Sequence, residues 1–315
     1  MQRRVFWLWL GLLLAGGAWA APPAGQELDE LLLLQDRLVV EQFTRQFPVD
    51  RRYDEVLSRI AGRTAPHVAE VFPGEAETVY FVVVLSNLGF NAVSWHRVVI
   101  VDTLLLDGLK RFSQGIVVYG GLDNPYGRGL AAQLHQLAVR GELGGPLRSR
   151  FDPHNPYALL PPPGLTPDQA RRAEAVFEEL LAAWMCHEVS HAYLGHARMR
   201  LLKAWDLEKA DQARTNPLIL RQQIEHYLDF QLGPANELEA DRAGAALALR
   251  SGYGLEGFCY NFEIIRQLEH LSGADTQYYR SHPYPEDRIR VVLAVERGLR
   301  EPRPPLGVPP GSLTR

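Results

Sequence analysis

The chain has 315 residues, 46% of them hydrophobic and 22% charged, a balance typical of a globular protein with a substantial core. Its formal net charge of −4 excludes the strongly basic character of a nucleic-acid-binding protein, so no nucleic-acid partner is expected. No repeated period stands out, which argues against a solenoid or a propeller.

The first residues have the pattern of an export signal. Two arginines precede an apolar run over residues 5–14, and an A-x-A cleavage site ends at Ala20. The sequence therefore predicts a signal peptide over residues 1–20 and an exported protein, periplasmic or secreted, that is soluble after cleavage. The alternative is an uncleaved segment that anchors the protein, and membrane contact is expected only in that case.

Helices and then strands are expected next. Leucine and valine at helical spacing predict a helix over residues 27–46, within an N-terminal segment of residues 21–49, and a second helix over residues 51–61. Runs of β-branched and aromatic residues predict strands. They cover residues 78–85, 93–101 and 116–119 and would form a small, mainly antiparallel sheet.

Glycine and proline punctuate residues 120–165, which predicts a long loop insertion with a short helix near residues 130–139. Because the insertion leads directly into a helix capped by Thr166, we interpret it as a candidate lid over a functional site. That helix is expected to run from residue 167 to about residue 205. Later helices are expected over residues 218–232, 237–250, 258–271 and 286–299, followed by a disordered Pro-rich tail over residues 301–315.

The capped helix contains the run His187-Glu188-Val189-Ser190-His191. Residues four apart lie on one face of a helix, so the two imidazoles project side by side and can bind one metal ion. Glu188 is then placed to take a proton from a water molecule at the metal. This pattern predicts a catalytic zinc site.

A catalytic zinc site needs a third protein ligand. His196 is close in sequence, but on a continuous helix it would lie about 140° around the axis from His191 and point away. Glu237, on a later predicted helix, can supply a carboxylate ligand. Asp241, one turn further on, can accept the second ring N–H of a ligating histidine.

The two cysteines, Cys186 and Cys259, have two interpretations in an oxidising compartment. We favour two small buried thiols, because Cys186 directly precedes a presumed ligand on a buried helix. A disulfide is the alternative.

The chain resembles metallopeptidase family forty-eight, the gluzincin family of the HtpX heat-shock protease and the CAAX prenyl endopeptidase. The likeness is carried by H-E-V-S-H-A-Y-L-G-H, N-E-L-E-A-D-R-A-G, S-G-Y-G and S-H-P-Y-P-E-D-R, in the family's order. It is closest to the soluble, exported branch. It implies an α+β, mostly helical fold with a single gluzincin domain over residues 50–300, a small sheet and the H-E-x-x-H active-site helix.

The resemblance also implies roles for single residues. It assigns one Zn2+ ion per chain to the ligands His187, His191 and Glu237. The general base falls on Glu188. Asn91 and Ala92 match the start of the family's edge strand, which pairs with extended peptide substrate. After Ala92 the chain departs from the family's usual Pro-Gly-Gly stretch.

The S-H-P-Y-P-E-D-R run supplies two further candidate catalytic residues. His282 is a turn residue before a proline, a hydrogen-bond donor to the oxyanion, or a plug that takes the open metal position in a resting protease. Arg288 either orients His282 or the oxyanion, or forms an ion pair on the helix surface.

These features together predict a zinc-dependent endopeptidase that hydrolyses peptide bonds of polypeptides, such as misfolded or envelope proteins. One alternative is a catalytically silent, chaperone-like binder of unfolded envelope proteins. Another is a zinc enzyme that cleaves something other than peptides.

Overall fold

The computed structural model describes residues 26–74, 78–84, 90–142, 163–211, 233–272 and 282–300. The predicted signal peptide, the C-terminal tail, the helix at 218–232 and much of the 120–165 insertion lie outside these ranges. None of the helices within them has the length and apolar content that crossing a membrane requires.

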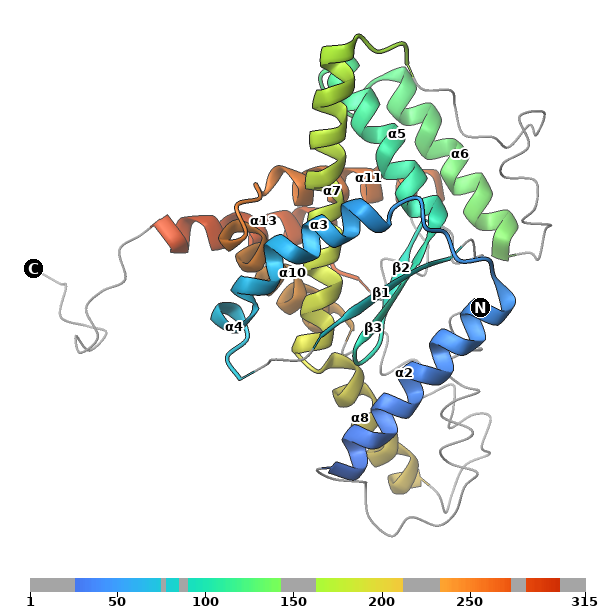
Figure 1. Cartoon of the computed structure of the whole chain (residues 1–315), viewed down its shortest axis with the longest axis vertical. Coiled ribbons are helices and arrows are strands. Elements are labelled where there is room, and N and C mark those ends of the chain that lie inside the picture. The colour runs from blue at the N-terminus through green and yellow to red at the C-terminus, as the bar shows by residue number, and fades with distance from the viewer. Residues whose placement is uncertain are drawn as a thin grey trace, which may run out of the picture.

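The described part is mostly helical with one small sheet, the predicted α+β class (Figure 1). The helices are α2 (Gln26–Gln46), α3 (Asp54–Thr64), the 3-10 helix η1 (Ala65–His67), α4 (Val68–Val71), α5 (Thr103–Tyr119), α6 (Pro125–Glu142), α7 (Pro167–Tyr193), α8 (His196–Asp211), α10 (Gly233–Arg250), α11 (Glu256–Ser272) and α13 (Pro285–Arg300). Helices α2, α3, α10, α11 and α13 lie close to their predicted bounds.

The sheet has the strand order β1-β3-β2, with β1 (Tyr80–Val84), β2 (Ala92–Ser94) and β3 (Val98–Asp102). Strand β1 pairs with β3 in parallel and β2 pairs with β3 antiparallel, so the sheet is mixed rather than mainly antiparallel. The predicted strand over 93–101 is wrong as a single unit. A tight turn divides it into β2 and β3, with the Trp95 N–H donating to the Val98 carbonyl at 2.8 Å.

The predicted third strand at residues 116–119 is also wrong, because these residues form the last turn of α5. The helix begins directly after β3, where the Asp102 side chain accepts a hydrogen bond from the Leu104 N–H at 2.8 Å. It ends at Gly120, whose φ of 76° is the left-handed conformation of a helix C-terminus. These end signals outweigh the β-branched run. Helix α6 is likewise longer than the short helix predicted near 130–139.

The two faces of β3 bury different partners because successive side chains of a strand alternate between faces. Val98 and Ile100 pack with Val39 and Phe43 of α2, whereas Val99 and Val101 face the main core among the helices. Helix α2 thus covers one face of the sheet. This double burial explains why β3 is apolar at nearly every position.

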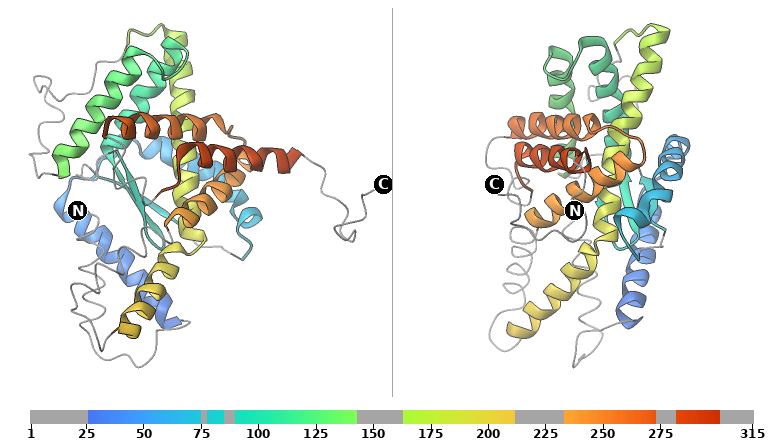
Figure 2. Two further views of the ribbon diagram at one scale, coloured as in Figure 1. Left: turned by 180° about the vertical axis from the view of Figure 1, so that it is seen from behind. Right: turned by 90° about the vertical axis from the view of Figure 1, so that its left-hand side faces the viewer.

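Helix α7 runs through the centre of the fold and contacts α5, α10, α11 and the strands β2 and β3 (Figure 2). Its start is the predicted capping box, in which Thr166 and Gln169 exchange side-chain-to-backbone hydrogen bonds. The predicted continuation to residue 205 is wrong. The helix ends at Tyr193, and after a turn at Leu194 and Gly195 the chain begins α8 in a new direction.

Candidate metal centre

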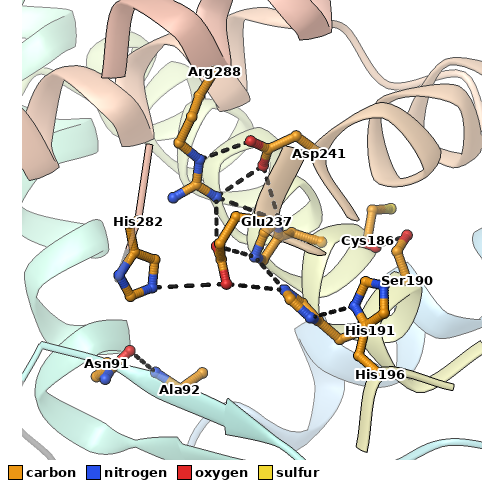
Figure 3. A network of polar contacts seen from close by, with 11 residues as sticks. Asn91, Ala92, Cys186, Ser190, His191, His196, Glu237, Asp241, His282 and Arg288 are labelled. Carbon is orange, nitrogen blue, oxygen red and sulfur yellow. Dashed lines mark hydrogen bonds and ion pairs between the residues drawn. The ribbon is translucent and has the colours of Figure 1, made fainter. Parts of the chain in front are cut away.

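Three side chains from α7 and α10 meet at one point (Figure 3). The Nε2 atoms of His187 and His191 are 3.1 Å apart. Glu237 Oε2 lies 3.4 Å from His187 Nε2, and Glu237 Oε1 lies 3.4 Å from His191 Nε2. Within the described residues these three are the group of histidine and carboxylate atoms close enough to share a metal ion.

The spacing of this cluster fits zinc. Nitrogen and oxygen ligands bind zinc at about 2.0–2.2 Å in tetrahedral geometry, which places neighbouring ligand atoms about 3.4 Å apart. The 3.1 Å between the two nitrogens is close to this value, and each nitrogen has one oxygen of Glu237 at 3.4 Å, although the two oxygens differ. Two imidazoles and one carboxylate are also the ligand set of a catalytic zinc site that leaves one position open.

Close packing of α10 against α7 positions the carboxylate ligand. A Cβ atom at Gly244 would lie 3.0 Å from the backbone of Cys186 and from the His187 nitrogen, so a side chain there would push the two helices apart by a few tenths of an ångström. Glu237 lies almost two turns earlier on α10. The short helix-to-helix distance therefore brings its side chain to the two histidines.

A second carboxylate on α10 holds His187 from the other side. The Asp241 Oδ1 atom lies 2.9 Å from His187 Nδ1, and Asp241 is completely buried. Arg288 of α13 makes a two-pronged ion pair with Asp241 at 2.7 and 2.8 Å and lies 3.2 Å from Glu237. The prediction of an Arg288 ion pair on the helix surface is wrong in its location, because Arg288 is 4% exposed.

The charges of this cluster favour a bound cation. Burial alone would raise the pKa of Asp241, but the neighbouring Arg288 and His187 have the larger effect, so the pKa is lowered. Burial also raises the pKa of Glu237, and the surrounding histidines hold it well below its usual range. Burial lowers the pKa of His187, but Asp241 and Glu237 raise it to about 10. Because a metal and a proton compete for the same nitrogen, the site attracts either one.

His196 lies beside the cluster, contrary to the expectation that it points away. The expectation failed because α7 does not continue: Gly195 has a φ of 67°, and the turn it makes returns His196 to His191. Their Nδ1 atoms are 2.8 Å apart, and His196 Nε2 lies 3.4 Å from the Glu239 carboxylate. Burial and neighbouring His191 lower the pKa of His196 to about 3.

Sequence reasoning missed the contacts of His196 and Glu239. The one local signal was Gly195, since glycine commonly follows the last turn of a helix. Nothing in the spacing of Glu239 from the histidines indicated its contact.

The other candidate residues lie around the same cluster. Glu188 is buried at 7% exposure on α7, directly after His187. His282 is half-buried, and its Nε2 atom is 3.7 Å from the Glu237 Oε1 atom. Asn91 and Ala92 lie at the start of β2, on the side of the cluster shown at the bottom of Figure 3.

Cys186 and Cys259 are both free, so the alternative of a disulfide is not realised. Cys186 is buried, and burial raises the pKa of its thiol to about 12. Cys259 is partly exposed. The favoured interpretation of two thiols is confirmed, although only Cys186 is fully buried.

Comparison with known proteins agrees with this geometry. Residues 173–296 match Peptidase family M48, a segment that begins within α7, ends within α13 and contains all three metal-binding candidates. Neither the curated proteins nor the solved structures gave a match. Residues 173–296 therefore form a domain of peptidase family M48, a family of zinc metallopeptidases.

Proposed function

We propose that the protein is an exported zinc endopeptidase that hydrolyses unfolded or misfolded envelope polypeptides, with one Zn2+ ion per chain. The cluster of His187, His191 and Glu237 near β2, an edge strand of the sheet in the described part of the chain, carries the proposal. The N-terminal export pattern supports a periplasmic or secreted location.

Glu188 supplies the proton chemistry in this proposal. Its carboxylate follows His187 on α7 and is mostly shielded from bulk water, as suits a general base in a water-poor site. It takes the proton of the attacking water and delivers it to the leaving amine. Bound to the three ligands, zinc supplies Lewis acidity toward the scissile carbonyl and that water.

Strand β2 is the proposed substrate-binding edge. Asn91, Val93 and Trp95 face β3 in hydrogen-bonding positions, as shown by the Asp102 N–H to Asn91 carbonyl bond of 3.2 Å and the Trp95 to Val98 bond. In an antiparallel pair the alternate residues direct their N–H and C=O groups away from the partner. Ala92 and Ser94 therefore offer backbone groups to an extended peptide.

The Asn91 side chain occupies one of the backbone groups on this edge. Its side-chain Oδ1 accepts a hydrogen bond from the Ala92 N–H at 2.9 Å, the group that would otherwise face the substrate. A peptide that pairs with β2 therefore uses the Ala92 carbonyl and the Ser94 backbone, or displaces the Asn91 side chain. The departure from the family's usual sequence begins directly after Asn91 and Ala92, at Val93.

The decisive experiment measures zinc content and casein cleavage for the purified protein and its Glu188→Gln variant. The variant should keep one zinc per chain and lose cleavage by about 100-fold or more, because a general base contributes about 10²–10⁴-fold. Glu174→Gln, an exposed glutamate of the same helix, is the matched control and should cleave normally.

A Glu188→Gln variant that kept a tenth of the parent activity would contradict the assigned base. If the parent bound zinc and suppressed aggregation of unfolded proteins but cleaved nothing, the chaperone-like alternative would replace the peptidase.

A further inference from the structure

We infer that His196, supported by Glu239, is a positioning residue that fixes the ring orientation and the protonated nitrogen of the ligand His191. The inference rests on the proposed metal centre but concerns a contact outside its three ligands.

The two nitrogens of His191 face different partners. Its Nε2 atom faces the cluster, 3.1 Å from His187 Nε2 and 3.4 Å from Glu237. Its Nδ1 atom faces away from the cluster, 2.8 Å from the Nδ1 atom of His196 (Figure 3). His191 therefore binds a metal through Nε2 while His196 holds the opposite side of the ring.

The hydrogen bonds can then be assigned without ambiguity. A neutral imidazole that uses the lone pair of Nε2 for a metal carries its hydrogen on Nδ1. His191 thus donates from Nδ1, and His196 accepts at Nδ1. His196 must then carry its own hydrogen on Nε2, the atom that lies 3.4 Å from the Glu239 carboxylate. Each contact has one donor and one acceptor, and the chain ends on an acceptor.

The first three turns of α10 therefore support both histidine ligands. Glu237 faces the metal position, Asp241 accepts from His187 at 2.9 Å, and Glu239 accepts from His196. His187 is held directly by a carboxylate, whereas His191 is held through the ring of His196. Partners of this kind fix the tautomer of a ligating histidine and commonly change metal affinity about 10–100-fold.

Burial makes the role of His196 specific. The residue is 3% exposed, so water cannot easily take the place of its ring. Glu239, by contrast, is more than half exposed at 55% of its side chain, so water can replace part of its contribution. The main effect is thus expected from His196 itself.

Two substitutions separate the hydrogen bond from the space that the ring fills. His196→Leu fills much of the space of the ring with an apolar side chain but offers no hydrogen-bond acceptor to His191. His196→Asn offers its Oδ1 atom near the position of the imidazole Nδ1 and can accept the same hydrogen bond. His270→Leu, at an exposed position of α11, is the matched control.

The test measures the zinc dissociation constant against a chelating dye, the visible absorption of the Co2+-substituted protein, and the melting temperature without metal. His196→Leu should bind zinc about 10–100-fold more weakly and shift the Co2+ spectrum. His196→Asn should recover most of the affinity and the parent spectrum, and His270→Leu should match the parent.

The inference is overturned if His196→Leu binds zinc as tightly as the parent, or if a folded His196→Asn binds as weakly as His196→Leu. Should His196→Leu fail to fold, the Co2+ spectrum of His196→Asn decides: a parent-like spectrum supports the inference and a shifted one overturns it. A parent protein that binds no zinc would instead refute the proposed function.

Discussion

At the scale of single residues, the first prediction concerns Glu237. It is the ligand that sequence spacing supports least, because it lies far along the chain from the two histidines. Glu237→Ala should lose zinc on dialysis, because two histidines alone leave the site one protein ligand short. Asp241→Ala removes a supporting contact and should weaken binding about 10–100-fold. Metal analysis after dialysis gives the ranking, with Glu174→Ala as the control that retains zinc.

Equal zinc retention in Glu237→Ala and the Glu174→Ala control would exclude Glu237 as a ligand. A loss in Asp241→Ala as complete as in Glu237→Ala would show that Asp241 does more than orient His187.

Arg288 gives a prediction about stability. It is a buried cation that pairs with the buried Asp241 and with Glu237, whose side chain is 13% exposed. Removing one partner of a buried ion pair costs about 3–5 kcal/mol, because the remaining charge stays buried. Arg288→Met should therefore lower the unfolding free energy of the metal-free protein in urea by this order.

Arg288→Lys is the informative companion. It keeps the positive charge but cannot reproduce the two-pronged contact with Asp241, so its loss should be smaller. If Arg288→Met unfolded at the same urea concentration as the parent, the ion pair would contribute nothing to the fold.

His282 has two candidate functions with opposite phenotypes. Its Nε2 atom is 3.7 Å from the Glu237 Oε1 atom, so it already lies beside the cluster. We expect it to act as a plug, so that His282→Ala raises basal cleavage of casein. A lower rate would indicate the oxyanion donor, whose removal costs about 2.7–4 kcal/mol of transition-state stabilisation. An unchanged rate would leave only the turn before Pro283.

At the scale of whole elements, the close contact of α10 with α7 gives the next prediction. Gly244→Ala places a methyl group 3.0 Å from backbone atoms of Cys186 and His187, which move less easily than the end of a side chain. The two helices must separate, so stability should fall by about 1–3 kcal/mol. Because Glu237 moves with α10, zinc affinity should fall as well.

Gly62 in α3 is the matched control for this substitution. No atom lies within 4 Å of a Cβ built there, so Gly62→Ala should raise stability by up to about 1 kcal/mol, as alanine favours a helix. Thermal melting and zinc titration of both variants make the comparison. Opposite signs are expected, and a stabilised Gly244→Ala would contradict the close packing.

At this scale, the sequence predicted some helix ends correctly and mispredicted others. The start of α7 was predictable because a capping box is local, and the ligand pair His187 and His191 needs only helical spacing. The end of α7 depends on one glycine inside an otherwise helical pattern, so the position of His196 was mispredicted. The run at 116–119 was mispredicted because side-chain branching is a weaker determinant than the helix-end signals at Asp102 and Gly120.

Contacts between distant segments were the least predictable. Arg288 reaches Asp241 only because α13 packs on α10, and no spacing rule relates the two residues. The burial of Arg288 could not be predicted, because the S-H-P-Y-P-E-D-R run is equally compatible with an exposed position on a helix.

At the scale of the whole molecule, α2 is held on the sheet by an apolar cluster and by one buried acid. Asp36 is 4% exposed, and its Oδ2 atom accepts the Arg97 backbone N–H at 3.0 Å in the turn between β2 and β3. Its Oδ1 atom has no hydrogen-bond partner among the described residues. The N-terminal helix is thereby joined to the hairpin that carries the proposed substrate edge.

The acid makes this attachment dependent on pH. Burial raises the pKa of Asp36 from 3.8 to about 6, although the backbone N–H groups of Arg97 and His96 act in the opposite direction. A folded-state pKa above the unfolded value means that folding favours the protonated form. The contribution of Asp36 is therefore fully present below pH 3.8 and is lost as the pH rises through about 6.

Asp36→Asn tests this dependence, since the amide keeps an oxygen for the Arg97 N–H and cannot ionise. Between pH 4 and pH 7, urea unfolding of parent and variant should give the smallest difference in unfolding free energy at about pH 4, where the parent carboxyl is protonated in the folded state and roughly half protonated in the unfolded state. The difference should then grow in favour of the variant up to about pH 7, because only the parent must bury a negative charge there. Asp29→Asn, which removes a half-exposed carboxylate of the same helix paired with Arg198, is the control and should show no such trend between these pH values. A constant difference between Asp36→Asn and the parent would mean that folding does not raise the pKa of Asp36, and that the attachment of α2 does not depend on pH in this range.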